Sequence, residues 1–195
     1  MLSFFQNIKP IMLILHAIAA AIALGGTLLS DVFFFNFARN YTISNAEDRV
    51  LRILSSTLWF ALVGIIISGI GLYLSAPDVY NDSAKFIAKM ILVVVVILNG
   101  IVLNVLVAPR LKMIAFDKEL DQKNDVAWLR QLAFASGFVS LSTWLIIFIL
   151  GSVARIPVSA GIFLLGYVIF EVMGIIGSQI FAHFIARRHT RERKG

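Results

Sequence analysis

Long apolar runs separated by short polar connectors dominate the chain. Two windows, residues 10–30 and 90–109, hold no formally charged side chain. Each is about 20 residues long, which is the length at which a helix crosses the hydrocarbon core of a bilayer. Three further runs are similarly apolar. The pattern predicts an all-α integral membrane bundle of five transmembrane helices, at residues 10–37, 50–74, 84–108, 126–153 and 158–186.

Connectors and composition agree with one helical membrane domain over residues 1–186. The connectors are short and polar, and Pro157 is expected to close a tight turn that makes the last two spans antiparallel neighbours. Of the 195 residues, 59% are hydrophobic and 14% charged, whereas a soluble domain carries about 25% charged residues. The lack of cysteine excludes disulfides, thiolate metal sites and a cysteine nucleophile.

Basic residues predict the direction of the helices. Of the 17 Lys and Arg side chains, 13 fall around the first and third connectors and the C-terminus; the exceptions are Lys9, Lys85, Lys89 and Arg155. The positive-inside rule then places the N-terminus outside and the C-terminus inside. Residues 187–195 are expected to form a basic cytoplasmic tail that anchors the topology or contacts anionic lipid. The expected partner of these charges is the lipid bilayer, and no nucleic acid is expected.

Ionisable residues inside a span are costly, so each is a candidate site residue. His16 lies about two turns inside the predicted outer end of the first span, on a face that continues with small residues to Gly26. Small residues let a neighbouring helix approach closely, or leave room for a flat macrocycle with His16 as axial ligand. A structural, hydrogen-bonded histidine is the alternative. Lys89 lies at a similar depth on the third span, and it either snorkels to the head groups or pairs with a substrate carboxylate or heme propionate.

Glu171 lies near the predicted bilayer midplane in the last span. A carboxyl group at that depth is protonated, paired or exposed to a wet cavity. A functional interpretation makes Glu171 a proton relay or a hydrogen-bonding partner of a quinone or propionate. The alternative is a neutral carboxyl group that bonds to Ser136, Ser140 or Thr143 on the fourth span.

The remaining polar residues predict interfacial or packing roles. Asp31 and His183 fall near the predicted cytoplasmic boundary, where water and head groups reach them. Asn99 and Asn104 are expected to form hydrogen bonds between helices, and Trp59 is expected in an aromatic belt at the membrane interface.

Two segments resemble a known group of proteins. The run LHAIAAAIALGG at residues 15–26 opens the first span, and KMIL at residues 89–92 lies near the start of the third. Both resemble segments of small bacterial membrane proteins that include the HemJ-type protoporphyrinogen oxidases and the copper-resistance-D-like proteins. The resemblance covers the first three spans. It implies a multi-pass protein of the bacterial inner (plasma) membrane that binds heme b through His16, with Lys89 serving the site.

Three functional hypotheses follow. The first is a membrane heme b protein with a redox or electron-transfer role, in which His16 is the metal ligand, His16 and Lys89 bind the cofactor, and Lys89 and Glu171 are the candidate catalytic residues. The second is a transporter or channel for a small solute or proton, centred on Glu171. The third is a non-catalytic subunit of a membrane complex.

The heme hypothesis carries further expectations. A sixth ligand would come from Met12, Lys89 or Met90, or from His16 of a second copy in a homodimer. A quinone or porphyrin is the expected small-molecule partner, and an enzyme of this kind would be a heme-dependent membrane oxidoreductase. Whether the chain is an enzyme stays open. The site is expected in the predicted outer half of the bundle, where His16 and Lys89 lie.

Overall fold

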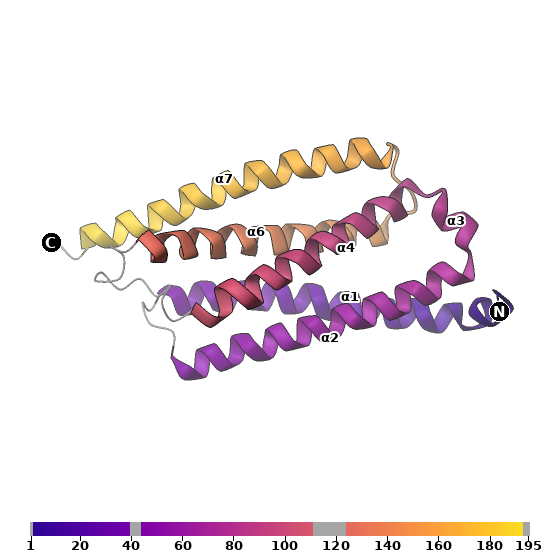
Figure 1. Cartoon of the computed structure of the whole chain (residues 1–195), viewed down its shortest axis with the longest axis horizontal. Coiled ribbons are helices and arrows are strands. Elements are labelled where there is room, and N and C mark those ends of the chain that lie inside the picture. Colours follow the sequence, from indigo (N-terminus) through magenta and orange to yellow (C-terminus); the bar gives the residue numbers. More distant parts are fainter. Residues whose placement is uncertain (1, 40–43, 111–123, 193–195) are drawn as a thin grey trace.

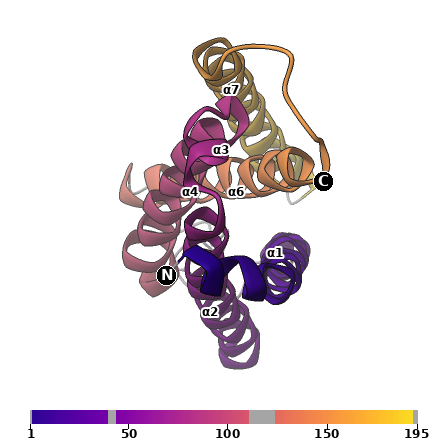
Figure 2. The ribbon, with the colours of Figure 1, turned by 90° about the vertical axis from the view of Figure 1, so that its right-hand side faces the viewer.

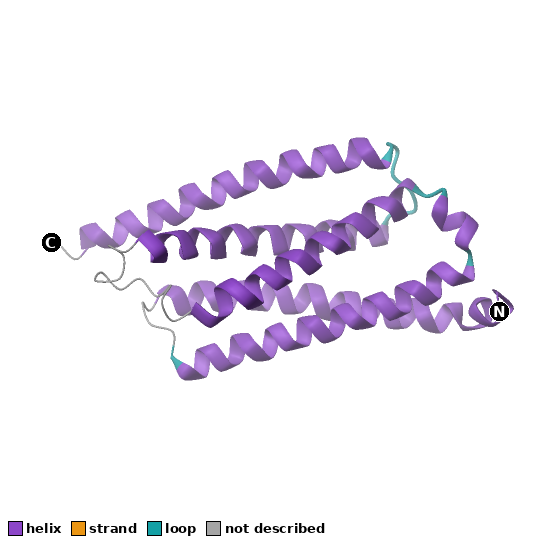
Figure 3. Ribbon diagram, viewed as in Figure 1, coloured by secondary structure: helices purple, strands orange, loops and turns teal. Residues whose placement is uncertain are grey.

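The computed structural model of the chain is a bundle of long helices that run along one axis (Figures 1 and 3). It describes residues 2–39, 44–110 and 124–192, and in the last helix it describes side chains up to Ile180. All elements within these ranges are helical, and no strand occurs in them. In chain order they are α1 (Leu2–Arg39), α2 (Asn45–Ser75), the short α3 (Pro77–Asn81), α4 (Ala84–Val102), the π-helical turn η1 (Leu103–Val107), the 3-10 turn η2 (Ala108–Arg110), α6 (Asn124–Ser152) and α7 (Ala160–Glu192).

Five of these helical segments are long and apolar enough to cross a membrane, which confirms the predicted all-α bundle of five spans. The third span is continuous from α4 through η1 and η2. The first helix begins earlier than the predicted residue 10. It runs through Pro10, because a proline removes one backbone hydrogen bond without always ending a helix. The last helix ends at Glu192, beyond the predicted residue 186.

The two termini lie at opposite ends of the bundle (Figure 1). The N-terminus, α3 and the connection from α6 to α7 lie at one end, called here the N-terminal end. The C-terminus and the end of α1 lie at the other, called here the C-terminal end. At this C-terminal end, a capping box starts α2: the backbone N–H of Glu47 donates to the Ser44 hydroxyl at 3.3 Å, and the Glu47 carboxylate accepts from the Ser44 backbone N–H at 2.7 Å.

Helix packing divides the bundle into two sides. Figure 2 shows α1 and α2 on one side, α7 on the other, and α4 and α6 between them. The closest pair is α1 with α2, and α6 contacts α7, α4 and α1. Small residues permit the approach of α1 to α2, since a Cβ on Gly64 would lie 3.4 Å from the Cβ of Ala19. As predicted, α6 and α7 are neighbours.

Side-chain hydrogen bonds join α4 to its neighbours, as expected for asparagines in a membrane span. The Asn99 amide donates to the carbonyl of Ser136 on α6 at 2.9 Å. Ser55 of α2 donates to the side-chain carbonyl of Asn104 at 2.9 Å, and the Asn104 amide donates to the Gly100 carbonyl within its own segment. These bonds confirm the predicted interhelical role of Asn99 and Asn104.

Candidate functional site

The C-terminal half of the bundle contains a cavity of about 800 Å³. This volume falls in the range of about 300–1,000 Å³ that small-molecule sites occupy. Its walls come from α1, α2, the third span, α6 and α7, so all five spans contribute. The third span changes to π-helical geometry along the cavity, at Leu103–Val107, just before Pro109, which has no N–H to continue the α-helical pattern. Single π turns inside α-helices frequently occur at functional sites.

The cavity wall is largely apolar and aromatic. Its aromatic members are Phe34, Trp59, Phe134, Phe138 and Trp144. The sequence pattern places Trp59 in an interfacial belt. In the structure, Trp59 of α2 is instead half-buried and its ring faces α4, where a Cβ on Gly100 would lie 3.4 Å from the ring. Gly174 faces Phe138 so closely that any side chain at residue 174 would overlap the phenyl ring.

An ion pair lies where the cavity reaches the surface. The Arg52 guanidinium contacts the Asp48 carboxylate at 2.8 Å, one turn apart on α2, and both residues line the cavity. The Arg52 side chain is 65% exposed, whereas that of Asp48 is 12% exposed. The cavity therefore extends from the bundle interior to the surface near the C-terminal end.

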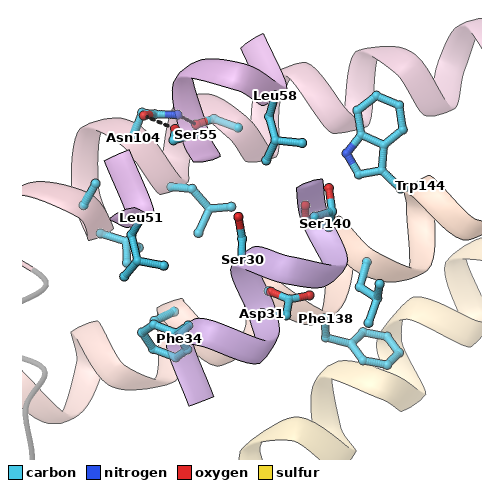
Figure 4. A pocket seen from close by; sticks show the side chains of 18 of the residues that line it. Ser30, Asp31, Phe34, Leu51, Ser55, Leu58, Asn104, Phe138, Ser140 and Trp144 are labelled. Atoms are coloured by element: carbon cyan, nitrogen blue, oxygen red, sulfur yellow. Dashed lines mark hydrogen bonds between the residues drawn. The ribbon is translucent and has the colours of Figure 1, made fainter. Parts of the chain in front are cut away.

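Several polar side chains of the described residues line the cavity without a described partner. Figure 4 shows Ser30 and Asp31 of α1 near Phe138 and Ser140 of α6, with Trp144 beyond. Within the ranges that the structure describes, none of Ser30, Asp31, Ser140 and Trp144 makes a side-chain hydrogen bond or ion pair. An unpartnered polar group in an apolar span costs about 1–3 kcal/mol, so these groups favour a cavity that holds water or a polar ligand group.

A packed core closes the cavity toward the N-terminal end. Leu62, Val96 and Trp144 belong both to the cavity wall and to this core, which continues with the fully buried Ala23 and Leu92. The cavity is therefore open on one side of the bundle and closed on the other.

His16 lies beyond this core, in the N-terminal half, between α1 and α2. Its Nδ1 lies 3.0 Å from the Ser68 hydroxyl, and its ring lies beside Gly69. The hydroxyl hydrogen of Ser68 is directed to the Gly64 carbonyl at 2.6 Å, so Ser68 accepts from the His16 Nδ1–H. When the ring with this tautomer is neutral, Nε2 is the unprotonated nitrogen, which is the one that can bind a metal.

The cavity and His16 are well separated. The nearest cavity residue on α1 is Thr27, about 16 Å along the helix at roughly 1.5 Å per residue. A ligand inside the cavity therefore cannot contact His16. Within the described ranges, no group of three or more His, Asp or Glu side chains could hold a metal ion.

Lys89 shares the N-terminal half with His16, and the two side chains interact electrostatically. The Lys89 ammonium faces α6 near its C-terminal end, where a Cβ on Gly151 would lie 3.7 Å from Nζ. Lys85, one turn earlier, donates to the Val153 carbonyl at 2.7 Å. Both lysines therefore lie at the carbonyl end of α6, where the helix dipole favours positive charge.

Glu171 is 7% exposed and lies between α6 and α7, outside the cavity wall. Its Oε1 accepts from Ser142 at 2.6 Å, and its Oε2 makes no hydrogen bond to any residue that the structure describes. Ser142 makes the hydrogen bond, and of the three residues expected from the sequence only Thr143 lies beside the carboxyl group, together with Tyr167. The Ser142 hydroxyl also lies 2.7 Å from the Phe138 carbonyl, and its single hydrogen cannot serve both acceptors. A protonated Glu171 that donates to Ser142 would satisfy both contacts.

The sequence did not single out the residues that form the cavity. Asp31 was assigned to the membrane boundary, Trp59 to an interfacial belt and Ser140 to the possible partners of Glu171, whereas Ser30 was given no role. One signal was present: Thr27, Ser30 and Asp31 form a polar patch on one face of the first span. The side chain of His183 lies outside the described residues, so its predicted interfacial position remains a prediction.

No protein-family model, curated protein or solved structure matches this chain.

Proposed function

We propose that the chain is a membrane carrier that binds a small amphipathic molecule in the cavity of its C-terminal half. The observation that carries this proposal is the cavity itself: it is large, aromatic, reaches one end of the bundle and is closed at the other by packed core. A site inside the bundle that is open to one side is the arrangement that a carrier presents in one of its alternating states. This proposal replaces Glu171 with the cavity as the centre of the transport hypothesis, because Glu171 does not line the cavity.

Cavity filling tests this function. Ser140→Phe places a phenyl ring in the cavity without removing a hydrogen bond, and is expected to weaken binding of the neutral amphiphile triphenylphosphine oxide at least tenfold. Binding is measured by calorimetry on protein in lipid nanodiscs, with empty nanodiscs as the blank. Ser152→Phe is the control, since Ser152 lies exposed at the far end of the same helix and loses only a bond to the Phe148 carbonyl of that helix. Wild-type protein that gives no more heat than empty nanodiscs contradicts the proposal.

The orientation of His16 supports heme b binding as a second candidate function. The Nδ1–H donated to Ser68 fixes the ring and leaves Nε2 as the ligand nitrogen, which is how proteins commonly orient a metal-binding histidine. Because packed core separates His16 from the cavity, a porphyrin on Nε2 would lie on the lipid-facing surface of α1 and α2 or between two copies of the chain. In both arrangements the Lys89 charge, whose field reaches His16, would favour a nearby propionate.

An absorption spectrum tests the heme proposal. Protein purified from cells supplied with a heme precursor is expected to show a Soret band that His16→Ala removes and Ser68→Ala shifts or weakens. His183→Ala serves as the control for a histidine placed elsewhere. A chain without a Soret band, or with one that survives His16→Ala, rules out this function.

A further inference from the structure

The charges around the cavity do not balance. Its charged lining residues, within the part of the chain that the structure describes, are Asp31, Asp48 and Arg52. Asp48 and Arg52 form an ion pair at 2.8 Å. Asp31 therefore remains as a carboxyl group that no described basic residue pairs with.

Asp31 lies well inside the bundle and faces open space. Its position is eight residues before the end of α1 at Arg39, which is about 12 Å of helix. Opposite it on α6 stands Gly137, where a Cβ would lie 3.6 Å from Asp31 Oδ1. The carboxyl group therefore lies beside the backbone of α6 at Gly137, and both residues line the cavity.

The rest of the wall favours an organic cation over a metal ion. Hydrated metal ions such as Mg²⁺ and Ca²⁺ take six or more oxygen ligands, and one carboxyl group with a few hydroxyls among aromatic rings does not supply them. Aromatic rings, by contrast, attract cations to their faces, and tryptophan does so most strongly. Trp59 and Trp144 both line this cavity.

We propose that the cavity binds lipophilic organic cations, with Asp31 as the counter-charge and Trp59 and Trp144 as aromatic walls. This inference rests on the proposed function and adds the chemical class of its ligand. The apolar groups of the cation pack against the aromatic wall. Its charge lies near the Asp31 carboxylate and is stabilised by both the carboxylate and the rings.

Three probes of similar shape and different charge test the ligand class. They are tetraphenylphosphonium (a cation), triphenylphosphine oxide (neutral) and tetraphenylborate (an anion), each titrated calorimetrically into the full-length protein in nanodiscs of neutral lipid. We expect tetraphenylphosphonium to bind at least tenfold more tightly than either other probe. This comparison uses the wild-type chain and needs no variant to fold.

Substitution of Asp31 then tests the residue. Asp31→Asn is expected to weaken tetraphenylphosphonium binding at least tenfold and to leave triphenylphosphine oxide binding unchanged, whereas Asp31→Glu, which keeps the charge, retains most of the affinity for the cation. Asp78→Asn, the same change on exposed α3 at the other end, is expected to have no effect.

The outcomes separate this inference from the proposed function. Equal affinity for the cation and the neutral probe, or cation binding that survives Asp31→Asn, overturns the cation inference and leaves the cavity function standing. Tighter binding of tetraphenylborate overturns it as well. Binding of none of the three probes overturns both.

Discussion

Individual residues set the contact between α6 and α7, and Gly174 is the most sensitive of them. Even a methyl group at residue 174 would overlap the Phe138 ring, so Gly174→Ala is expected to destabilise the protein by about 1–3 kcal/mol, the usual cost of overpacking. Thermal unfolding of the detergent-solubilised protein measures this loss. Because Phe138 lines the cavity, its displacement should also weaken binding of triphenylphosphine oxide.

A neighbouring glycine supplies the control for this prediction. Gly177 lies one turn further along α7, also lines the cavity, and has no atom within 4 Å of an added Cβ. Gly177→Ala should therefore change stability by less than about 0.5 kcal/mol. Similar unfolding temperatures for the two variants would show that Phe138 does not pack against α7 as the structure has it.

At the residue scale, sequence reasoning found polar residues at depth but could not assign their surroundings. The cost of an ionisable group inside a span drew attention to His16, Lys89 and Glu171. Their partners depend on which helices meet, and the pattern of a single helix does not contain that information. Asp31 was underestimated for the same reason: its distance from the helix end suggested a boundary position, whereas the packing of the five spans leaves a cavity beside it.

At the element scale, α2 and α4 are joined by side chains more than by close backbone contact, because the cavity lies between them. The hydrogen bond from Ser55 to Asn104 is one of these links. A double-mutant cycle of Ser55→Ala and Asn104→Ala is expected to give a coupling energy of about 0.6 kcal/mol, and at most about 1.7, as for other hydrogen bonds between membrane helices. Unfolding by a denaturing detergent measures the four variants.

Ser56 offers an adjacent comparison for that cycle. It also lines the cavity, but it makes no side-chain hydrogen bond within the described ranges. Ser56→Ala should therefore show no coupling with Asn104→Ala. Coupling of equal size at both serines would indicate a general effect of removing hydroxyls from α2 rather than a bond between Ser55 and Asn104.

Helix number and type followed from the sequence, whereas local irregularities did not. Apolar length alone identified all five spans, because the bilayer imposes that length on any spanning helix. Pro10 was taken as a helix start, although the helix passes through it. The π turn before Pro109 was not predicted, because a proline removes one backbone N–H but does not by itself fix whether the helix ends, kinks or forms a π turn.

At the scale of the whole molecule, the two halves of the bundle differ in what they can do. The N-terminal half is packed core, with His16 bonded to Ser68 and with Lys85 and Lys89 at the carbonyl end of α6. The C-terminal half encloses the cavity. The sequence pointed to the half that holds His16, because residue type can be read from sequence, whereas empty space between helices arises only from their packing.

The orientation of the bundle decides which compartment supplies the cavity. The distribution of basic residues predicts that the C-terminal end faces the cytoplasm, so the cavity should open to the cytoplasm. Because the chain contains no cysteine, single cysteines can report this directly. Ala154→Cys and Ala46→Cys are a matched pair, since both alanines are exposed and lie at opposite ends.

A membrane-impermeant maleimide is expected to label residue 154 in spheroplasts and residue 46 only after the membrane is permeabilised. This outcome would place the open end of the cavity on the cytoplasmic side, so that a ligand enters from the cell interior in the state described here. The reverse labelling would invert the orientation, and the same cavity would then take its ligand from outside. In that case the first and third connectors and the C-terminus, to which 13 of the 17 basic residues belong in the sequence, would face outward, against the rule that governs the insertion of most membrane helices.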